Sequence, residues 1–203
     1  MWFSRLVGGI VTATAVLIPM TVKDISPPVH VADRDSIGIP APALQLDQWL
    51  NSPQLEIAAL RGKVVLIRWW TDGCPYCEAS APALRTFDRK YRDQGLVVIG
   101  VFHPKPPGDP SVERMTRAAE RFHFTFPIAL DTDWKALNRW WLDGWPQAWT
   151  SVSFLIDRQG IIRYVHPGGE YHEGPGGDQM SDHSACHSDY RQLERSIVQL
   201  LGR

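Results

Sequence analysis

Two cysteines placed between a buried strand and the start of a helix constrain this chain more than any other feature. Cys74-Pro75-Tyr76-Cys77 follows an apolar run, Val64 to Ile67, that extends to Trp70. After the motif, apolar residues recur at helical spacing as far as Tyr91. Pro75 suits an early helical position, because proline lacks a donor that the first helical turn does not use. The pattern predicts an α/β unit in which a strand delivers both thiols to a helix N-terminus.

That position predicts different roles for the two thiols. The unpaired amide groups and the positive end of the helix dipole stabilise an anion, so Cys74 is expected to ionise more easily than an ordinary thiol. Cys77 lies one helical turn further on, close enough to form a disulfide with Cys74 but more shielded. We expect Cys74 to attack a partner's disulfide or to be attacked itself, and Cys77 to resolve the mixed disulfide, with no cofactor beyond this redox-active pair.

Metal binding is the alternative use of the same thiols. Cys74 and Cys77 fit half of a structural zinc site completed by Cys186 and a histidine, although such sites normally recruit a second closely spaced pair. A carrier that binds copper through both cysteines and a histidine is a further alternative. The strand and helix around the motif favour redox chemistry over both.

The rest of the chain alternates short apolar runs with helical periodicity. Strands are predicted at 64–70, 96–102, 126–130, 152–156 and 161–165, and helices at 74–91, 112–122, 134–141 and 190–201. The last two strands form a hairpin around Asp157-Arg158-Gln159-Gly160. This order describes one mixed sheet covered by helices on both faces.

Length and charge limit the function classes. The 203 residues are enough for one domain of ~150 residues and an appendage. Lys and Arg total 21 against 22 Asp and Glu, and this balance argues against a protein that binds nucleic acid by neutralising phosphates.

The appendage is the N-terminus. Arg5 precedes an apolar stretch at residues 6–22, which predicts a signal peptide or a membrane anchor over residues 1–22. A proline-containing linker is expected at 23–42, and the folded domain at 43–203. The chain is therefore expected in the periplasm or otherwise outside the cytoplasm, with residues 6–22 as an anchor in the inner membrane if they are not removed.

Residues 168–188 differ from the rest, because they are rich in Gly, His and acidic residues. We interpret them as an inserted loop. His183, Cys186 and His187 are weak candidate ligands for zinc or copper, with His172 nearby. The alternative is a solvated loop whose histidines and cysteine share no role.

The segment from Lys63 to Leu84 resembles the active-site segment of the exported thioredoxin-like proteins of the TlpA, ResA and DipZ type, within the AhpC/TSA-redoxin superfamily. The runs Phe126-Pro127-Ile128-Ala129 and Phe154-Leu155-Ile156-Asp157 match later parts of that family, and Pro82 matches a proline that kinks its helix. The resemblance implies a thioredoxin fold, reduction of protein disulfides, protein thiol or disulfide clients, and a membrane electron donor. It also implies that Trp70 packs beside the site.

Three positions depart from the family. Gly73 replaces a common Trp, and Arg68 occupies the position of a buried acid or Asn. Ser151, preceded by Thr150, stands where the family has a cis-proline that helps to recognise substrate. We expect Arg68 to lower the pKa of Cys74, unless it reaches the surface or pairs with an acid such as Asp72.

Two further predictions concern neighbouring residues. Thr71 and Arg68 resemble the Thr and Arg of peroxiredoxins, so a thiol peroxidase is the alternative function. Against it, that family needs no second cysteine three residues on, and its Pro before the Thr is absent here.

Trp145 and Trp149 lie near the expected partner-binding loop and are candidates for an exposed docking surface.

Overall fold

A six-stranded mixed sheet forms the centre of the computed structural model, which describes residues 36–105, 110–143, 149–174 and 183–202. The strands lie in the order β1-β4-β3-β2-β5-β6. β2 pairs in parallel with β3, and β3 with β4, whereas the β1–β4, β2–β5 and β5–β6 pairs are antiparallel. The bounds are β1 Trp49–Leu50, β2 Val64–Trp70, β3 Leu96–Phe102, β4 Ile128–Leu130, β5 Ser153–Ile156 and β6 Ile162–His166.

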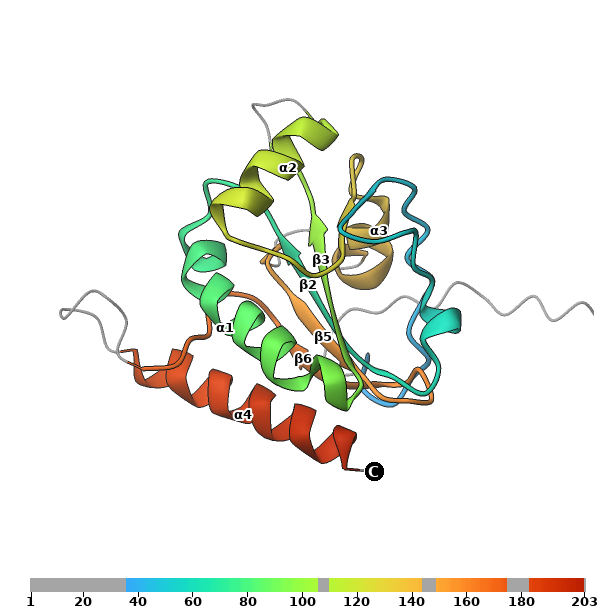
Figure 1. The fold of residues 1–203 in the computed structure, drawn as a ribbon, viewed down its shortest axis with the longest axis vertical. Coiled ribbons are helices and arrows are strands. Elements are labelled where there is room, and N and C mark those ends of the chain that lie inside the picture. The colour runs from blue at the N-terminus through green and yellow to red at the C-terminus, as the bar shows by residue number, and fades with distance from the viewer. Residues whose placement is uncertain (1–35, 106–109, 144–148, 175–182, 203) are drawn as a thin grey trace, which may run out of the picture.

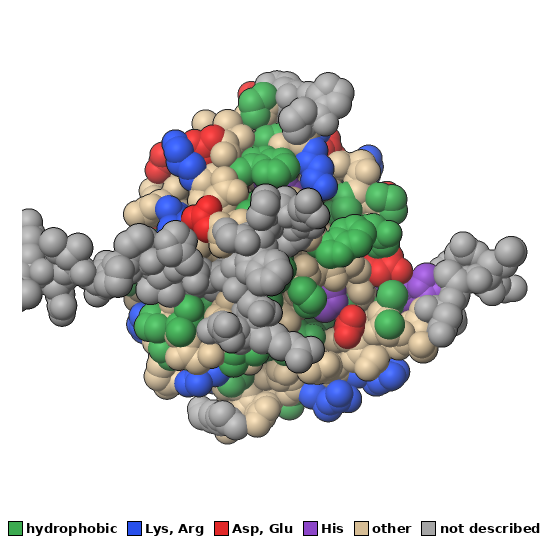
Figure 2. Space-filling model, turned by 180° about the vertical axis from the view of Figure 1, so that it is seen from behind, with side chains coloured by type: hydrophobic (Ala, Val, Ile, Leu, Met, Phe, Trp, Pro, Cys, Tyr) green, Lys and Arg blue, Asp and Glu red, His purple; other side chains and the backbone are tan. Residues whose placement is uncertain are grey.

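Helices cover both faces of the sheet (Figure 1). One face carries α1, Pro75–Tyr91, together with α2, Val112–Arg121, and α4, Ser184–Leu201. The other carries the short α3, Lys135–Leu137, which continues as the π-helical turn η4, Asn138–Leu142. Two 3₁₀ turns complete the elements, η2 at Ile57–Leu60 and η3 at Arg92–Gln94. Seen from the opposite side, hydrophobic side chains appear in patches near the middle, and Lys and Arg are scattered toward the edge (Figure 2).

β2 is the central strand, and it is buried along its whole length. Successive side chains of a strand point to opposite faces, so β2 contributes to both cores. Val64, Leu66 and Trp70 pack with α1, α2 and α4, while Val65, Ile67 and Trp69 pack with α3 and η4. A strand covered on both faces is hydrophobic at successive positions, which explains the apolar run in the sequence. Arg68 is the one charged residue in this strand.

The end of β2 and the start of α1 hold the two cysteines. Cys74 has extended backbone and caps α1, and Pro75 occupies the first helical turn as expected. α1 continues through Pro82 to Tyr91.

The predicted strands and helices are present, and two of the predicted boundaries are wrong. Gly38 and Ala41 donate backbone hydrogen bonds to Ile162 and Gly160, so the folded domain includes residues assigned to the 23–42 linker. The inserted loop does not extend to residue 188, because α4 begins at Ser184. The short strand β1 was not predicted; two residues are too few to show a periodicity.

The N-terminal prediction lies outside the described residues, since residues 1–35 are not among them. Within the described ranges, no helix combines the length and the apolar character needed to cross a membrane.

Candidate active site

Cys74 and Cys77 face each other at the N-terminus of α1, both as free thiols. The two Sγ atoms are 2.7 Å apart, with the Cys77 thiol donating to Cys74. The backbone N–H of Cys77 also donates to Cys74 Sγ at 3.3 Å. Cys74 is partly exposed, whereas Cys77 is only 2% exposed. A partner can therefore reach Cys74 first, and Cys77 is placed to attack from behind.

The surroundings of the two thiols separate their acidities. The hydrogen bond from Cys77 lowers the pKa of Cys74 to about 6, aided by the Cys77 backbone N–H and by the charges of Lys105 and Arg68. The same hydrogen bond raises the pKa of Cys77 far above its usual value, and burial raises it further. At neutral pH the pair therefore holds one thiolate, on the exposed sulfur, and one proton, on the buried sulfur.

Arg68 lies in the core beneath the cysteines, with its side chain fully buried. Its guanidinium donates to Ser153 Oγ at 3.2 Å, to Ser80 Oγ at 3.4 Å and to the Gly169 carbonyl at 2.7 Å. It also stacks on the ring of Tyr171, 4.8 Å from the centroid. All these partners are neutral, so the positive charge acts on both thiols and lowers their pKa values. The charge of Arg68 is thus a smaller cause of the lowered pKa of Cys74 than the hydrogen bond from Cys77, and its effect on reactivity stays a prediction.

The alternative pairing of Arg68 with Asp72 is wrong, because Asp72 pairs with Arg114. The Arg114 guanidinium donates to both carboxylate oxygens of Asp72, at 2.9 and 2.7 Å. This bond, more than any other contact, lowers the pKa of the Asp72 carboxyl. Arg114 thus offsets a negative charge only two residues from Cys74. No local sequence pattern indicates this pair, because Arg114 comes from α2.

A groove of about 420 Å³ opens beside Cys74. Its rim includes two exposed aromatic rings, Tyr76 at 40% and Trp149 at 57% exposure, which meet edge to face at 5.3 Å. Ser151 is buried in the groove wall and Thr150 is half-buried beside it. The predicted exposure of Trp149 is confirmed, whereas Trp145 lies outside the described residues. The remaining lining residues are Thr71, Asp72, Gly73, Pro75, Lys105 and Arg114.

Trp70 and His103 lie at the ends of β2 and β3, near the site. Trp70 packs against Phe102, Phe122 and Phe124, with ring centroids 5.0 to 5.4 Å apart. It belongs to the core cluster against which Cys74 packs, as the resemblance implied. His103 is fully buried, and burial lowers its pKa to about 3. Although it directly follows β3 at the edge of the sheet, His103 is therefore not a solvated loop histidine.

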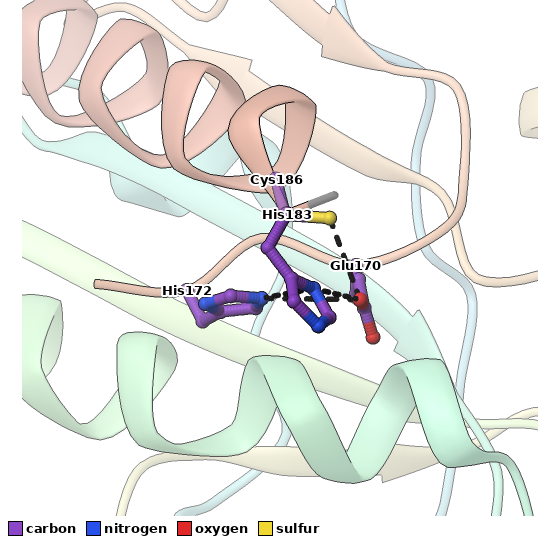
Figure 3. A group of neighbouring side chains, drawn as sticks. All are labelled: Glu170, His172, His183 and Cys186. Atoms are coloured by element: carbon purple, nitrogen blue, oxygen red, sulfur yellow. Dashed lines mark hydrogen bonds and ion pairs between the residues drawn. The ribbon is translucent and has the colours of Figure 1, made fainter. Parts of the chain in front are cut away.

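A second cluster of side chains lies between the segment after β6 and the first turn of α4 (Figure 3). It consists of Glu170, His172, His183 and Cys186. Of the predicted candidates, His183 and Cys186 belong to this group together with the nearby His172; His187 does not, and Glu170 was not among the candidates. Cys74 and Cys77 are not in this group, so the zinc site that combined them with Cys186 is not formed among the described residues.

Sequence reasoning missed Glu170, Tyr171 and Ser80. The order Glu170-Tyr171-His172 carried a usable signal, because neighbouring side chains in extended chain point to opposite sides. Tyr171 points into the core, fully buried, and its two neighbours share the other side. Ser80 carried no such signal, since a serine inside a helix has no distinctive pattern.

Comparison with known proteins agrees with this geometry. A model of the Redoxin family matches residues 37–180. Protein DipZ of Mycobacterium tuberculosis is 31% identical over 144 residues, which cover 69% of this chain and 20% of DipZ. The chain thus spans only about a fifth of the length of DipZ. Thiol-disulfide oxidoreductase ResA of Geobacillus kaustophilus is 30% identical over 133 residues, covering 66% of this chain and 70% of ResA.

Solved structures support the fold. The thioredoxin domain of a thiol-disulfide oxidoreductase from Bacteroides vulgatus superposes with a TM-score of 0.55, 22% identity and coverage of 79% of this chain and 97% of that chain. A thiol:disulfide interchange protein from Bacteroides sp. gives a TM-score of 0.57 at 20% identity, covering 84% of this chain and 93% of the other. Likeness at these identities concerns the fold alone, and it confirms the predicted thioredoxin fold.

Proposed function

The chain belongs to the Redoxin family, and on that premise we propose that it is a thiol–disulfide oxidoreductase that reduces disulfides of protein clients. The observation that carries the proposal is the arrangement of the two thiols. The accessible Cys74 has a pKa of about 6, and the shielded Cys77 lies 2.7 Å from it with its proton retained. Relatives that are named thiol-disulfide oxidoreductases support the same chemistry.

The proposed reaction has two exchange steps. Cys74 thiolate attacks one sulfur of the client disulfide, which forms a mixed disulfide and releases the other client sulfur as a thiolate. Cys77 then gives up its proton and attacks Cys74 Sγ, and the second client sulfur leaves. The client gains two electrons from the pair, one proton from Cys77 and one proton from water and becomes a dithiol, while Cys74 and Cys77 become a disulfide. The positive charge of Arg68 favours the Cys77 thiolate that the second step requires.

We propose the reducing direction, in which Cys74 is the attacking group. The hydrogen bond from Cys77 lowers the pKa of Cys74 and so favours the thiolate that this attack requires. A reductase needs a source of electrons to return its disulfide to the dithiol. We propose a membrane electron donor for this step, together with a location outside the cytoplasm, on the basis of the apolar sequence at residues 6–22.

The groove beside Cys74 supports a protein client. Its exposed Tyr76 and Trp149 form one joined aromatic surface at the rim, against which an extended polypeptide can pack. Ser151, in the position of the family's proline, leaves a hydroxyl in the wall of the same groove.

A reductase assay tests the proposal. The full chain should reduce insulin disulfides with a dithiol as electron donor, and Cys77→Ser should accumulate a mixed disulfide with the client through Cys74. Equilibration with glutathione should give a potential near the ~−270 mV of thioredoxin. Trapping through Cys77 in Cys74→Ser, or a potential near the ~−120 mV of DsbA, would contradict the attack order or the reducing direction, respectively.

The same assay series separates the peroxidase alternative. In the structure the Thr71 hydroxyl donates to Asp72, and the Arg68 guanidinium donates to Ser153, Ser80 and Gly169. The two residues that suggested a peroxiredoxin are thus committed to other partners. We expect slow consumption of hydrogen peroxide beside fast reduction of protein disulfides, and a faster peroxide reaction would favour the peroxidase.

A further inference from the structure

Four side chains with metal-ligating atoms converge at a place that the redox reaction does not use. Glu170 and His172 come from the segment after β6, whereas His183 and Cys186 come from the start of α4 (Figure 3). Their ligand atoms all lie within 4.8 Å of one another. His172 is 8% exposed, and the other three side chains are half-buried.

The spacing of these atoms fits a tetrahedral metal. Glu170 Oε1 is 3.8 Å from His172 Nε2, 3.4 Å from His183 Nδ1 and 3.4 Å from Cys186 Sγ. His172 Nε2 and His183 Nδ1 are 3.3 Å apart. Zinc bonds of ~2.0–2.3 Å in tetrahedral geometry place neighbouring ligand atoms ~3.3–3.7 Å apart. An ion can therefore sit among these four atoms with only small movements of the side chains.

The hydrogen bonding of His172 prepares it to act as a ligand. Its Nδ1 lies 2.9 Å from the Gly174 carbonyl oxygen. A carbonyl can only accept, so Nδ1 carries the proton, and the lone pair of the neutral ring is on Nε2. That atom is the one that faces the other three ligands. A backbone carbonyl behind a ligating histidine is the usual device that fixes its tautomer and orientation.

We propose that Glu170, His172, His183 and Cys186 bind one zinc ion. Two neutral imidazoles, one carboxylate and one thiolate carry two negative charges, which balance the charge of Zn²⁺. Two nitrogens, one oxygen and one sulfur suit zinc better than copper(I), which prefers sulfur-rich sites. Four protein ligands leave no open position, so the site is structural: it ties the segment after β6 to the first turn of α4.

His187 lies beside this site and is not one of its four ligands. Its ring packs edge to face on His172, with centroids 5.1 Å apart. This contact places His187 behind the His172 ring, outside the group of four ligand atoms.

Zinc titration of the full chain carrying Cys74→Ser and Cys77→Ser tests the site without the redox pair. Competition with a chromophoric chelator should show one Zn²⁺ per chain with a dissociation constant below a micromolar. Adding Cys186→Ser or His183→Asn should weaken binding at least tenfold. Asn is a good N-cap residue, so His183→Asn keeps the start of α4 intact. His123→Asn, an exposed histidine outside the cluster, is the matched control and should bind zinc as the parent does.

Alkylation of Cys186 gives a second readout that is independent of redox activity. In the same parent variant, zinc should slow the reaction of Cys186 with iodoacetamide at least tenfold, and a chelator should restore the rate. Cobalt(II) in place of zinc should give the intense absorption of a tetrahedral site with a thiolate ligand, lost in Cys186→Ser. Zinc binding that persists unchanged in Cys186→Ser, or alkylation unaffected by zinc, would overturn the proposal. Neither result bears on disulfide reduction, because the parent lacks both redox cysteines.

Discussion

The chain has two thiol sites at helix N-termini, and their surroundings give them opposite chemistry. Cys74 caps α1, and Cys186 lies in the first turn of α4. A donated hydrogen bond from Cys77 lowers the pKa of Cys74 to about 6, whereas burial and the neighbouring Glu170 raise the pKa of Cys186 to about 11. A helix N-terminus alone therefore does not activate a thiol. The neighbouring groups decide between a nucleophile and an inert thiol.

The largest expected difference between the two sites is in catalysis. Cys74→Ser should reduce the rate of insulin reduction by roughly a thousandfold or more, because removal of a nucleophile removes its covalent intermediate. Cys186→Ser should leave that rate unchanged. Steady-state turnover of both variants measures the contrast, and a comparable loss in Cys186→Ser would mean that the two sites are one functional unit.

Zinc should stabilise the folded protein through the cluster that contains Cys186 and not through Cys74 and Cys77. At free zinc ~100-fold above the dissociation constant, the free energy of unfolding should rise by about 2.7 kcal/mol, since zinc binds the folded state alone. Denaturant titration of the Cys74→Ser, Cys77→Ser variant with zinc or with chelator measures this change. The further substitution His183→Asn should remove most of it, and equal stabilisation in that variant would place the zinc elsewhere.

The rates at which Cys74 and Cys186 react with an alkylating agent compare the two sites directly. At pH 7 and without metal, Cys74 should react with iodoacetamide roughly 50-fold faster than Cys186, because its larger thiolate fraction outweighs its lower nucleophilicity. The Cys74 rate should fall as the pH is lowered through about 6, where the thiolate is protonated. Mass spectrometry of each peptide against pH gives both rates. Equal rates at pH 7 would remove the distinction.

We expect Arg114 to influence the pKa of Cys74 through Asp72, the carboxylate with which it pairs. Arg114→Ala leaves the Asp72 carboxylate uncompensated near Cys74, so the pKa of Cys74 should rise by up to about one unit. The pH dependence of Cys74 alkylation measures the rise. The double variant Asp72→Asn, Arg114→Ala removes both charges and should return the pKa toward that of the wild type; failure to do so would assign the effect to Arg114 alone.

The smallest expected effect belongs to Arg68. Arg68→Asn removes a buried positive charge and should raise the pKa of Cys74 by about half a unit, with a parallel rise for Cys77. The same alkylation profile measures it, with retained near-ultraviolet circular dichroism as the check on folding. An unchanged profile in a folded variant would mean that the charge of Arg68 does not reach the thiols.

The sequence was sufficient for the elements that depend on local pattern. The apolar run of β2, the helical spacing after Cys74 and the hairpin at residues 157–160 each arise from neighbours in the chain, and the structure contains all three. The first and last residues of these elements followed less directly from the sequence. The inserted loop ends where α4 begins at Ser184, because a helix start rich in polar residues resembles a loop in sequence.

The sequence by itself determined that two cysteines stand at the end of a buried strand and the start of a helix, since backbone conformation and side-chain periodicity are local properties. Only the tertiary structure decided what surrounds them. Arg68 meets Gly169 across 101 positions of the chain, and Asp72 meets Arg114 across 42. The same holds for Glu170, which joins Cys186 across 16 positions. Charge interactions act through space, so the pKa values and the metal-ligating group depend on how the sheet and helices bring distant segments together.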